Sequence, residues 1–154
     1  MSHALAIQGT RHGIWFWTLW AAFGMRIVAQ LLQHLHPVAL LPGFDAWHSA
    51  ILPYPALLTV QPTMVVALAG VAGRVSRGET RRRALLGKWL RRLGGLYLFV
   101  MLARLALGLT VLSGHIWFDK PVPTLFHLIL ATYLLVLAGY HSCTQGAPDA
   151  EKRI

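Results

Sequence analysis

The sequence contains a single cysteine, Cys143, and only five acidic residues among 154. One cysteine excludes an intrachain disulfide and a metal cluster built on cysteines. Charged residues of both signs make up 12% of the chain, whereas soluble domains contain about 25%. Hydrophobic residues make up 56% and gather in runs close to the length that crosses the hydrocarbon core of a bilayer. The composition therefore predicts an integral membrane protein of the all-α class.

Four apolar runs predict four transmembrane helices, over residues 13–35, 55–73, 93–113 and 124–141. We expect them to form one domain, a four-helix bundle. The first run follows a basic pair and superficially resembles a signal peptide. However, Arg26, Gln30 and Gln33 interrupt it and no small-residue cleavage site follows. We therefore expect a retained first span and a multi-pass protein.

The net charge of +9 would suit nucleic acid, but the positions of the basic residues argue against such a partner. Eight of the fourteen Lys and Arg residues lie in the linker 74–92, between the second and third spans. Loop 36–54 carries none, and loop 114–121 carries only Lys120. Because cytoplasmic loops are enriched in Lys and Arg, the linker and both termini are predicted to face the cytoplasm. Within the linker, residues 84–92 are expected to form a short amphipathic helix on the inner leaflet.

The two halves of the chain share a faint pattern. The first half reads FGMR, GFDAW and PYPALL, and the second reads VMLAR, IWFDK and PVPTLF. Each half thus has a mid-span arginine, an outer loop with Phe-Asp and a Pro-x-Pro start to the next helix. A two-plus-two duplication explains this pattern, and such repeats occur in transporters. Proline at helix starts and aromatic residues at membrane interfaces also recur for ordinary reasons, so both explanations stay open.

Seven histidines fall into two layers in this topology. The outer layer contains His34, His36, His48, His115 and His127, and the inner layer contains His12 and His141. The fourth span carries His127 and His141 fourteen residues apart, which on an ideal helix is about 21 Å of rise and nearly the same face.

Haem iron takes two axial imidazoles from facing helices. The fourth span therefore offers one ligand to each of two stacked haems. His12 can complete the inner pair and His48 the outer pair, with His34, His36 and His115 as rivals. The alternative is that these are interfacial histidines whose polar tips stay in water.

The segment HLILATYLLVLAGYH, residues 127–141, resembles the last helix of the bacterial cytochrome b five-six-one family. RHGIWFW and LGGLYLFVMLARLALGLTVLSG resemble the start of this family's first helix and its third helix. These proteins are four-helix, two-haem proteins of the inner membrane with a cytoplasmic N-terminus. The resemblance implies one or two haem b groups, a bacterial inner membrane, and the ligands His12, His48, His127 and His141. His48 departs from the pattern, because it precedes Pro53 and would need an earlier start to the second helix.

Two arginines, Arg26 and Arg104, lie near the middle of their spans, where an arginine costs about 2.5–3.5 kcal/mol on insertion scales. No Asp or Glu lies in any predicted span, so each arginine needs another partner. Candidates are a haem propionate, a quinone oxygen, backbone carbonyls, the side chain of Gln30 or Gln61, or a substrate. Both arginines are therefore candidate cofactor-binding residues, or they snorkel and bond carbonyls at a packing interface.

We predict a membrane b-type cytochrome that transfers electrons between the quinone pool and a partner protein or small redox compound. The alternatives are a cofactor-free accessory subunit of a larger membrane complex and a small transporter built from two repeats. Asp45 and His48 also form a plausible chelating pair for Cu(II) or Zn(II), with Asp119 in the matching loop. The sequence has no HExxH motif, hydrolase triad or phosphate-binding glycine loop, so enzymes of those classes are not indicated.

Overall fold

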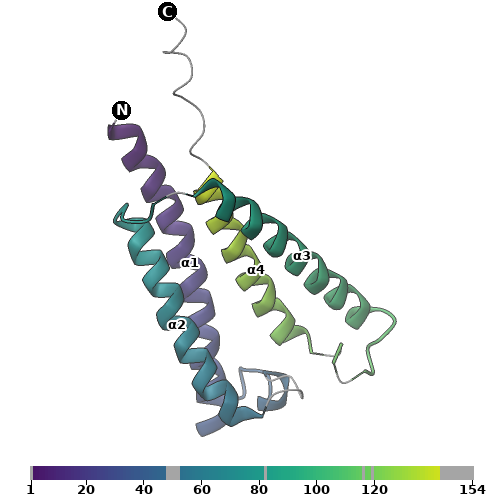
Figure 1. The fold of residues 1–154 in the computed structure, drawn as a ribbon. Helices are drawn as coiled ribbons and strands as arrows, with labels where there is room; N and C mark the ends of the chain where they lie inside the picture. Colours follow the sequence, from purple (N-terminus) through teal and green to yellow (C-terminus); the bar gives the residue numbers. More distant parts are fainter. Residues whose placement is uncertain (1, 48–52, 82, 116, 119, 143–154) are drawn as a thin grey trace, which may run out of the picture.

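The computed structural model describes residues 2–47, 53–81, 83–115, 117–118 and 120–142, with side chains from His12 onwards except that of Tyr54. The helices in chain order are α1 (Ser2–Leu35), the 3-10 helix η1 (Phe44–Ala46), α2 (Tyr54–Ser76), α3 (Ala84–Leu109) and α4 (Pro121–Ser142) (Figure 1). All four α-helices contain a stretch long and apolar enough to cross a membrane. The predicted all-α class is thereby confirmed for the described residues. Each of the four predicted spans corresponds to one helix of sufficient length.

Helix α3 differs most from its prediction. Residues 84–92 are helical, but they form the first turns of α3, so the expectation of a separate helix lying on the membrane was wrong. The physical reason is that nothing in the sequence from Ala84 to Leu109 removes a backbone donor, and the helical hydrogen bonds continue past Gly94 and Gly95. At its other end α3 stops at Leu109, where Thr110 leaves helical geometry. With 26 residues, α3 is about 39 Å long, more than the roughly 30 Å of the hydrocarbon core.

The backbones pack in the order α2, α1, α4, α3 (Figure 1). Among the described helices, α3 comes within 8 Å of α4 alone, measured between Cα atoms. The cluster of buried hydrophobic side chains that forms the core comes from the other three helices: Phe16, Ala72, Val75, Tyr133 and Tyr140. Tyr133 joins α4 to α2, because its hydroxyl donates to the carbonyl oxygen of Leu68 at 2.7 Å. Helices α1, α2 and α4 therefore enclose the core, and α3 lies outside it.

Glycines allow α3 to approach α4 closely. A Cβ atom at Gly94 would lie 3.1 Å from the Leu135 side chain, and one at Gly87 would lie 3.2 Å from the Ala138 carbonyl oxygen. Gly95, by contrast, has nothing within 4 Å of this position. Of the adjacent glycines in the third span, only Gly94 therefore serves the helix contact.

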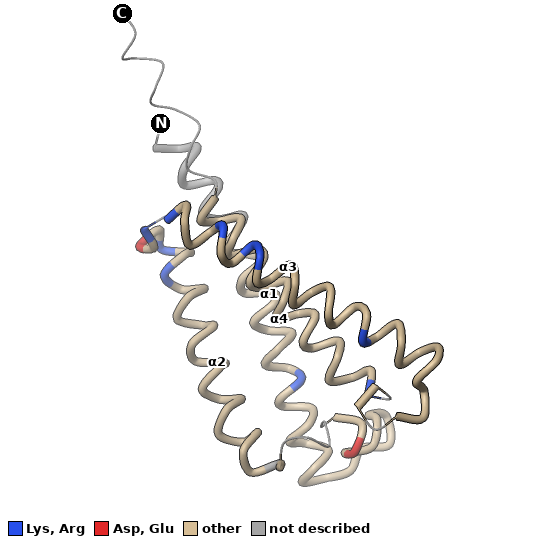
Figure 2. Tube along the Cα trace, turned by 45° about the vertical axis from the view of Figure 1, so that its right-hand side comes forward, with Lys and Arg blue, Asp and Glu red and all other residues tan. Residues whose placement is uncertain are grey.

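The basic residues of the linker gather at the ends of α2 and α3, where Figure 2 shows most of the Lys and Arg in blue. Arg77 and Glu79 form an ion pair of 2.7 Å on the surface. The hydrogen bond from Arg77 holds the pKa of the Glu79 carboxyl below its ordinary value. The linker residues after Glu79 are held against α4 by two hydrogen bonds. The Tyr140 hydroxyl donates to the Thr80 carbonyl oxygen at 3.0 Å, and the Arg83 N–H donates to His141 Nδ1 at 3.2 Å.

We expect Tyr140→Phe to loosen the linker without unfolding the helices. The substitution keeps the buried ring and removes one hydrogen bond, whose net value is about 1 kcal/mol. The linker would then open about five times more often, and cleavage by trypsin at its arginines would accelerate by the same factor. Unchanged cleavage would show that the Tyr140 hydroxyl does not hold the linker.

Candidate functional site

Arg26 lies nine residues before the end of α1 and binds the loop that follows this helix. Its Nη2 donates to the carbonyl oxygen of Trp47 at 2.8 Å, and its guanidinium lies 5.0 Å from the ring centroid of Phe126. Trp47 is itself fixed, because its indole N–H donates to the Pro42 carbonyl oxygen at 2.8 Å. The Nε atom of Arg26 is buried and has no hydrogen-bond partner. Arg26 thus uses a backbone carbonyl as its partner and keeps one free donor.

Arg104 in α3 makes the same kind of contact. Its Nη2 and Nε donate to the carbonyl oxygen of Trp117 at 2.6 and 3.1 Å, and its guanidinium lies 4.3 Å from the centroid of that ring. Backbone carbonyls were among the expected partners of both arginines. In each half of the chain, therefore, an arginine in the C-terminal part of a helix binds the carbonyl of a tryptophan in the loop that follows this helix. Because α3 ends at Leu109, Arg104 lies nearer to the end of its helix than the predicted span implied. This geometry matches the sequence pattern, and the two-plus-two duplication stays a prediction.

Two buried glutamines lie beside Arg26. Gln30, one helical turn after Arg26, is 1% exposed, and Gln61 in α2 is 4% exposed. The Gln61 amide nitrogen donates to Gln30 Oε1 at 3.2 Å, but the Gln30 amide nitrogen has no partner. A buried donor without an acceptor costs roughly 1–3 kcal/mol in proteins. Arg26 and Gln30 therefore each keep a buried donor without an acceptor.

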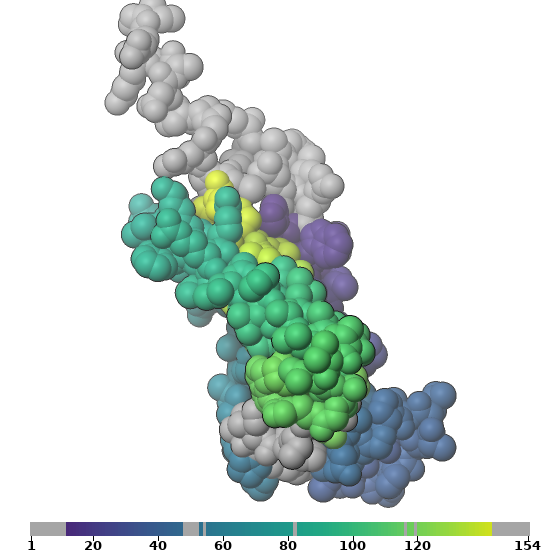
Figure 3. Space-filling view, turned by 90° about the vertical axis from the view of Figure 1, so that its right-hand side faces the viewer, coloured from purple at the N-terminus to yellow at the C-terminus, as the bar shows by residue number. Residues whose placement is uncertain are grey.

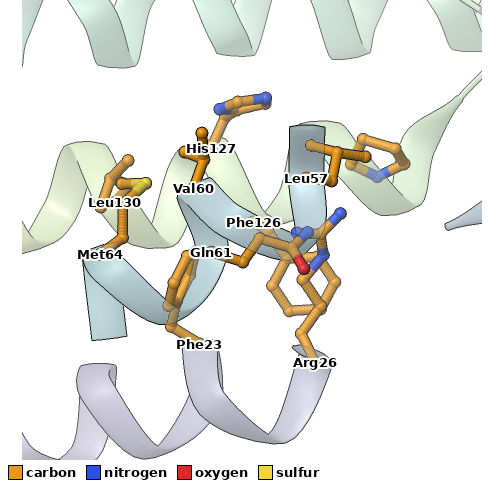
Figure 4. A pocket seen from close by; sticks show the side chains of 10 residues that line it. Phe23, Arg26, Leu57, Val60, Gln61, Met64, Phe126, His127 and Leu130 are labelled. Atoms are coloured by element: carbon orange, nitrogen blue, oxygen red, sulfur yellow. The ribbon is translucent and has the colours of Figure 1, made fainter. Parts of the chain in front are cut away.

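A pocket of about 150 Å³ lies between α1, α2 and α4 next to this polar group. Figure 4 shows Arg26, Gln61 and Phe126 together at one end of it, with Met64 and Leu130 at the other. Phe23, Leu57 and Val60 complete most of the apolar lining. The pocket thus has a polar end that offers donors and an apolar body.

The size of the pocket limits what it accommodates. An apolar cavity of about 150 Å³ holds one benzene ring, whereas sites for drug-sized ligands measure roughly 300–1,000 Å³. A single substituted ring fits this volume, and a porphyrin does not.

His127 lines the same pocket but binds α3. Its Nδ1 lies 2.6 Å from the hydroxyl oxygen of Tyr97, and Figure 4 shows its imidazole turned away from Arg26 and Gln61. In this position His127 joins α4 to the peripheral helix α3. The structure therefore places the predicted outer ligand apart from the polar end of the pocket.

The two histidines predicted for the inner layer both lie beside Tyr140. The ring centroids of Tyr140 and His141 are 5.5 Å apart. His141 also accepts a hydrogen bond from the Arg83 backbone N–H at Nδ1. His12 packs edge-on against Tyr140, with 5.9 Å between ring centroids.

The other predicted ligands that the structure describes also have contacts of their own. His48 lies outside the described residues, and α2 starts only at Tyr54, so the earlier start that His48 needed is not found. His34 packs on Phe44, and His115 accepts a hydrogen bond from the Trp117 backbone. Within the described ranges, no three His, Cys, Asp or Glu residues are grouped to hold a metal ion. Asp119, proposed for the outer metal site with Asp45, lies outside these ranges as well. Each described candidate ligand thus has a contact within the protein, and haem binding stays a prediction.

No protein-family model, curated protein or solved structure matches this chain. The resemblance to the cytochrome family therefore rests on the sequence segments alone. What the chain binds has to be argued from its own pocket.

Sequence reasoning named Arg26, Gln30 and Gln61, but it did not place Arg26 and Gln61 on one cavity with Gln30 bonded to Gln61. Polar side chains inside an apolar span were the available signal, because they are rare there and usually functional. Phe126 carried no such signal, since one more aromatic residue in an apolar helix is unremarkable. Tyr97 was likewise missed as the partner of His127.

Proposed function

We propose that the protein binds the head group of a lipid-soluble quinone in the pocket between α1, α2 and α4, as part of membrane electron transfer. The observation that supports this proposal is a ring-sized cavity lined by Arg26, whose buried Nε has no hydrogen-bond partner, and by Gln61. A quinone head is a single ring with two carbonyl acceptors and no donor. Its chemistry complements the donors of Arg26 and Gln61 at the polar end of the pocket.

Each side chain has a distinct part in this proposal. Arg26 donates to one carbonyl oxygen of the ring and stays near Phe126. Gln61, oriented by its bond to Gln30, directs its second amide hydrogen to the ligand. Phe23 and Phe126 pack against the ring, and the apolar lining excludes water.

The membrane and the orientation of the protein in it are inferred from the distribution of Lys and Arg along the chain. The protein belongs in the bacterial inner membrane, with the basic linker in the cytoplasm and the pocket in the outer half of the bilayer. The exposed side of α3 leaves room for another subunit of a membrane complex. Both statements remain proposals that rest on the positions of Lys and Arg and on the peripheral place of α3.

Haem remains a prediction from the sequence. Haem would supply one-electron transfer when bound, with His12, His48, His127 and His141 as its predicted ligands, and the quinone pocket does not depend on it. An absorption spectrum of the reduced, purified protein tests this directly. A Soret band would support the cytochrome prediction, and its absence would leave a quinone-binding protein without haem.

Calorimetric titration tests the proposed function. We expect the purified protein, in nanodiscs free of quinone, to bind a short-tail benzoquinone saturably, with one ligand per chain. A tail-matched alcohol, which partitions into the bilayer but has no quinone ring, is the control. Heat that never saturates, or that the alcohol reproduces, would contradict the proposal.

A second candidate follows from the charge of Arg26, which lacks a carboxylate partner among the described residues. A small aromatic carboxylate would satisfy the same donors, as expected for a transporter of organic anions. Benzoate in the same titration separates the two candidates. Binding of benzoate without binding of the quinone would favour the transporter.

A further inference from the structure

The first turns of α3 extend beyond the length that a bilayer core requires. They carry Lys88, Arg91 and Arg92 within two helical turns of Ala84. Gly87 and Gly94 are buried against α4 and define the side of α3 that faces the protein. The opposite side of this segment therefore faces the surroundings of the protein, and Figure 3 shows the outer surface of α3 in green toward the viewer.

Two large apolar residues lie on that opposite side. Leu85 and Trp89 are each two positions from Gly87, about 200° around the helix, and are 70% and 54% exposed. Leu93, Leu96 and Phe99 continue the exposed apolar surface along α3. An unbroken apolar surface thus runs from the projecting turns into the predicted span.

Basic side chains border the start of this surface. Lys88 and Arg92 are both exposed and lie one turn apart on the same side of α3. The Arg92 guanidinium lies 5.8 Å from the ring centroid of Trp89. This contact holds a cation directly beside the apolar surface. No acidic residue lies in α3, so these cations have no partner of opposite charge on their own helix.

We propose that this end of α3 binds an anionic phospholipid from the leaflet that faces the basic linker. The lipid phosphate lies between Lys88 and Arg92, and one acyl chain lies along Leu85, Trp89 and Leu93. Two features select a lipid over a soluble anion: the cations border an apolar surface, and this surface continues along the span. The inference is independent of the quinone pocket, which lies between the other helices.

Native mass spectrometry of the full-length protein with added phosphatidylglycerol tests this inference. Phosphatidylcholine serves as the uncharged comparison, and glycerol 3-phosphate as the soluble anion. We expect Lys88→Gln/Arg92→Gln to weaken binding of phosphatidylglycerol about 30-fold, because each substitution removes a direct hydrogen bond to the lipid phosphate that contributes about a fivefold gain. The matched control, Arg74→Gln/Arg91→Gln, removes the same charge from the same end of the molecule and should change affinity less than threefold.

Three outcomes would overturn the inference. Equal losses in the two double variants would mean that only the total charge matters. Equal binding of the two lipids would show that the phosphate contact confers no selectivity. Competition by millimolar glycerol 3-phosphate would assign the cations to a soluble anion.

Discussion

Arg26→Gln should weaken binding of a short-tail quinone by about 10- to 100-fold. The substitution removes a charged donor from the polar end of the pocket, and a hydrogen bond to a charged group contributes about 1.5–3 kcal/mol. Glutamine is too short to reach the same position and carries no charge. Calorimetric titration in nanodiscs measures the change as a ratio of dissociation constants.

Arg104→Gln is the matched control for this prediction. Arg104 makes the equivalent bonds to the Trp117 carbonyl oxygen but does not line the pocket. Its loss should reduce stability much as the loss of Arg26 does, and leave quinone affinity within about twofold. If both variants bound the quinone equally weakly, Arg26 would act through the fold rather than by contact with the ligand.

Gly108→Ala should destabilise the protein by about 1–3 kcal/mol, the usual cost of forcing extra atoms into a packed site. A Cβ atom at Gly108 would collide with the backbone carbonyl of Phe118, which a side-chain rotation cannot relieve. The loop before α4 would have to move, and the Arg104 bond to Trp117 lies in the same loop. The free energy of unfolding, measured by denaturant titration in mixed micelles, reports this loss.

Gly95→Ala, on the same helix, should not lower the free energy of unfolding. The position has open space around it, so alanine should be neutral or add about 0.5–1 kcal/mol, because it loses less backbone entropy than glycine. Equal destabilisation by both substitutions would mean that the contact at Gly108 is not what limits stability.

The sequence predicted the helices of the fold better than the packing of these helices against one another. Long apolar runs identified four helices because burial in lipid requires continuous hydrogen-bonded backbone. The ends of α3 were less predictable, since the charged residues 84–92 suit either a surface helix or the projecting end of a span. The peripheral place of α3 depends on Gly87 and Gly94 meeting α4, a pairing that no single-sequence pattern encodes.

In the candidate site, too, the sequence identified individual residues but not the contacts between them. Arg26, Gln30 and Gln61 were recognisable because polar groups are costly within a span, and backbone carbonyls were among their expected partners. The histidine spacing in α4 was correct as helical geometry, yet it did not determine which way each ring turns. Tyr97 and the Arg83 backbone orient His127 and His141, and both contacts join segments distant in sequence.

Photoaffinity labelling with an azido-benzoquinone, followed by peptide mapping, tests the quinone pocket most directly. The account predicts adducts in residues 20–30 of α1, 57–64 of α2 and 123–130 of α4, suppressed by excess unlabelled quinone and reduced in Arg26→Gln. Adducts confined to α3 or to the lipid-facing surface, or adducts that excess quinone does not suppress, would contradict it.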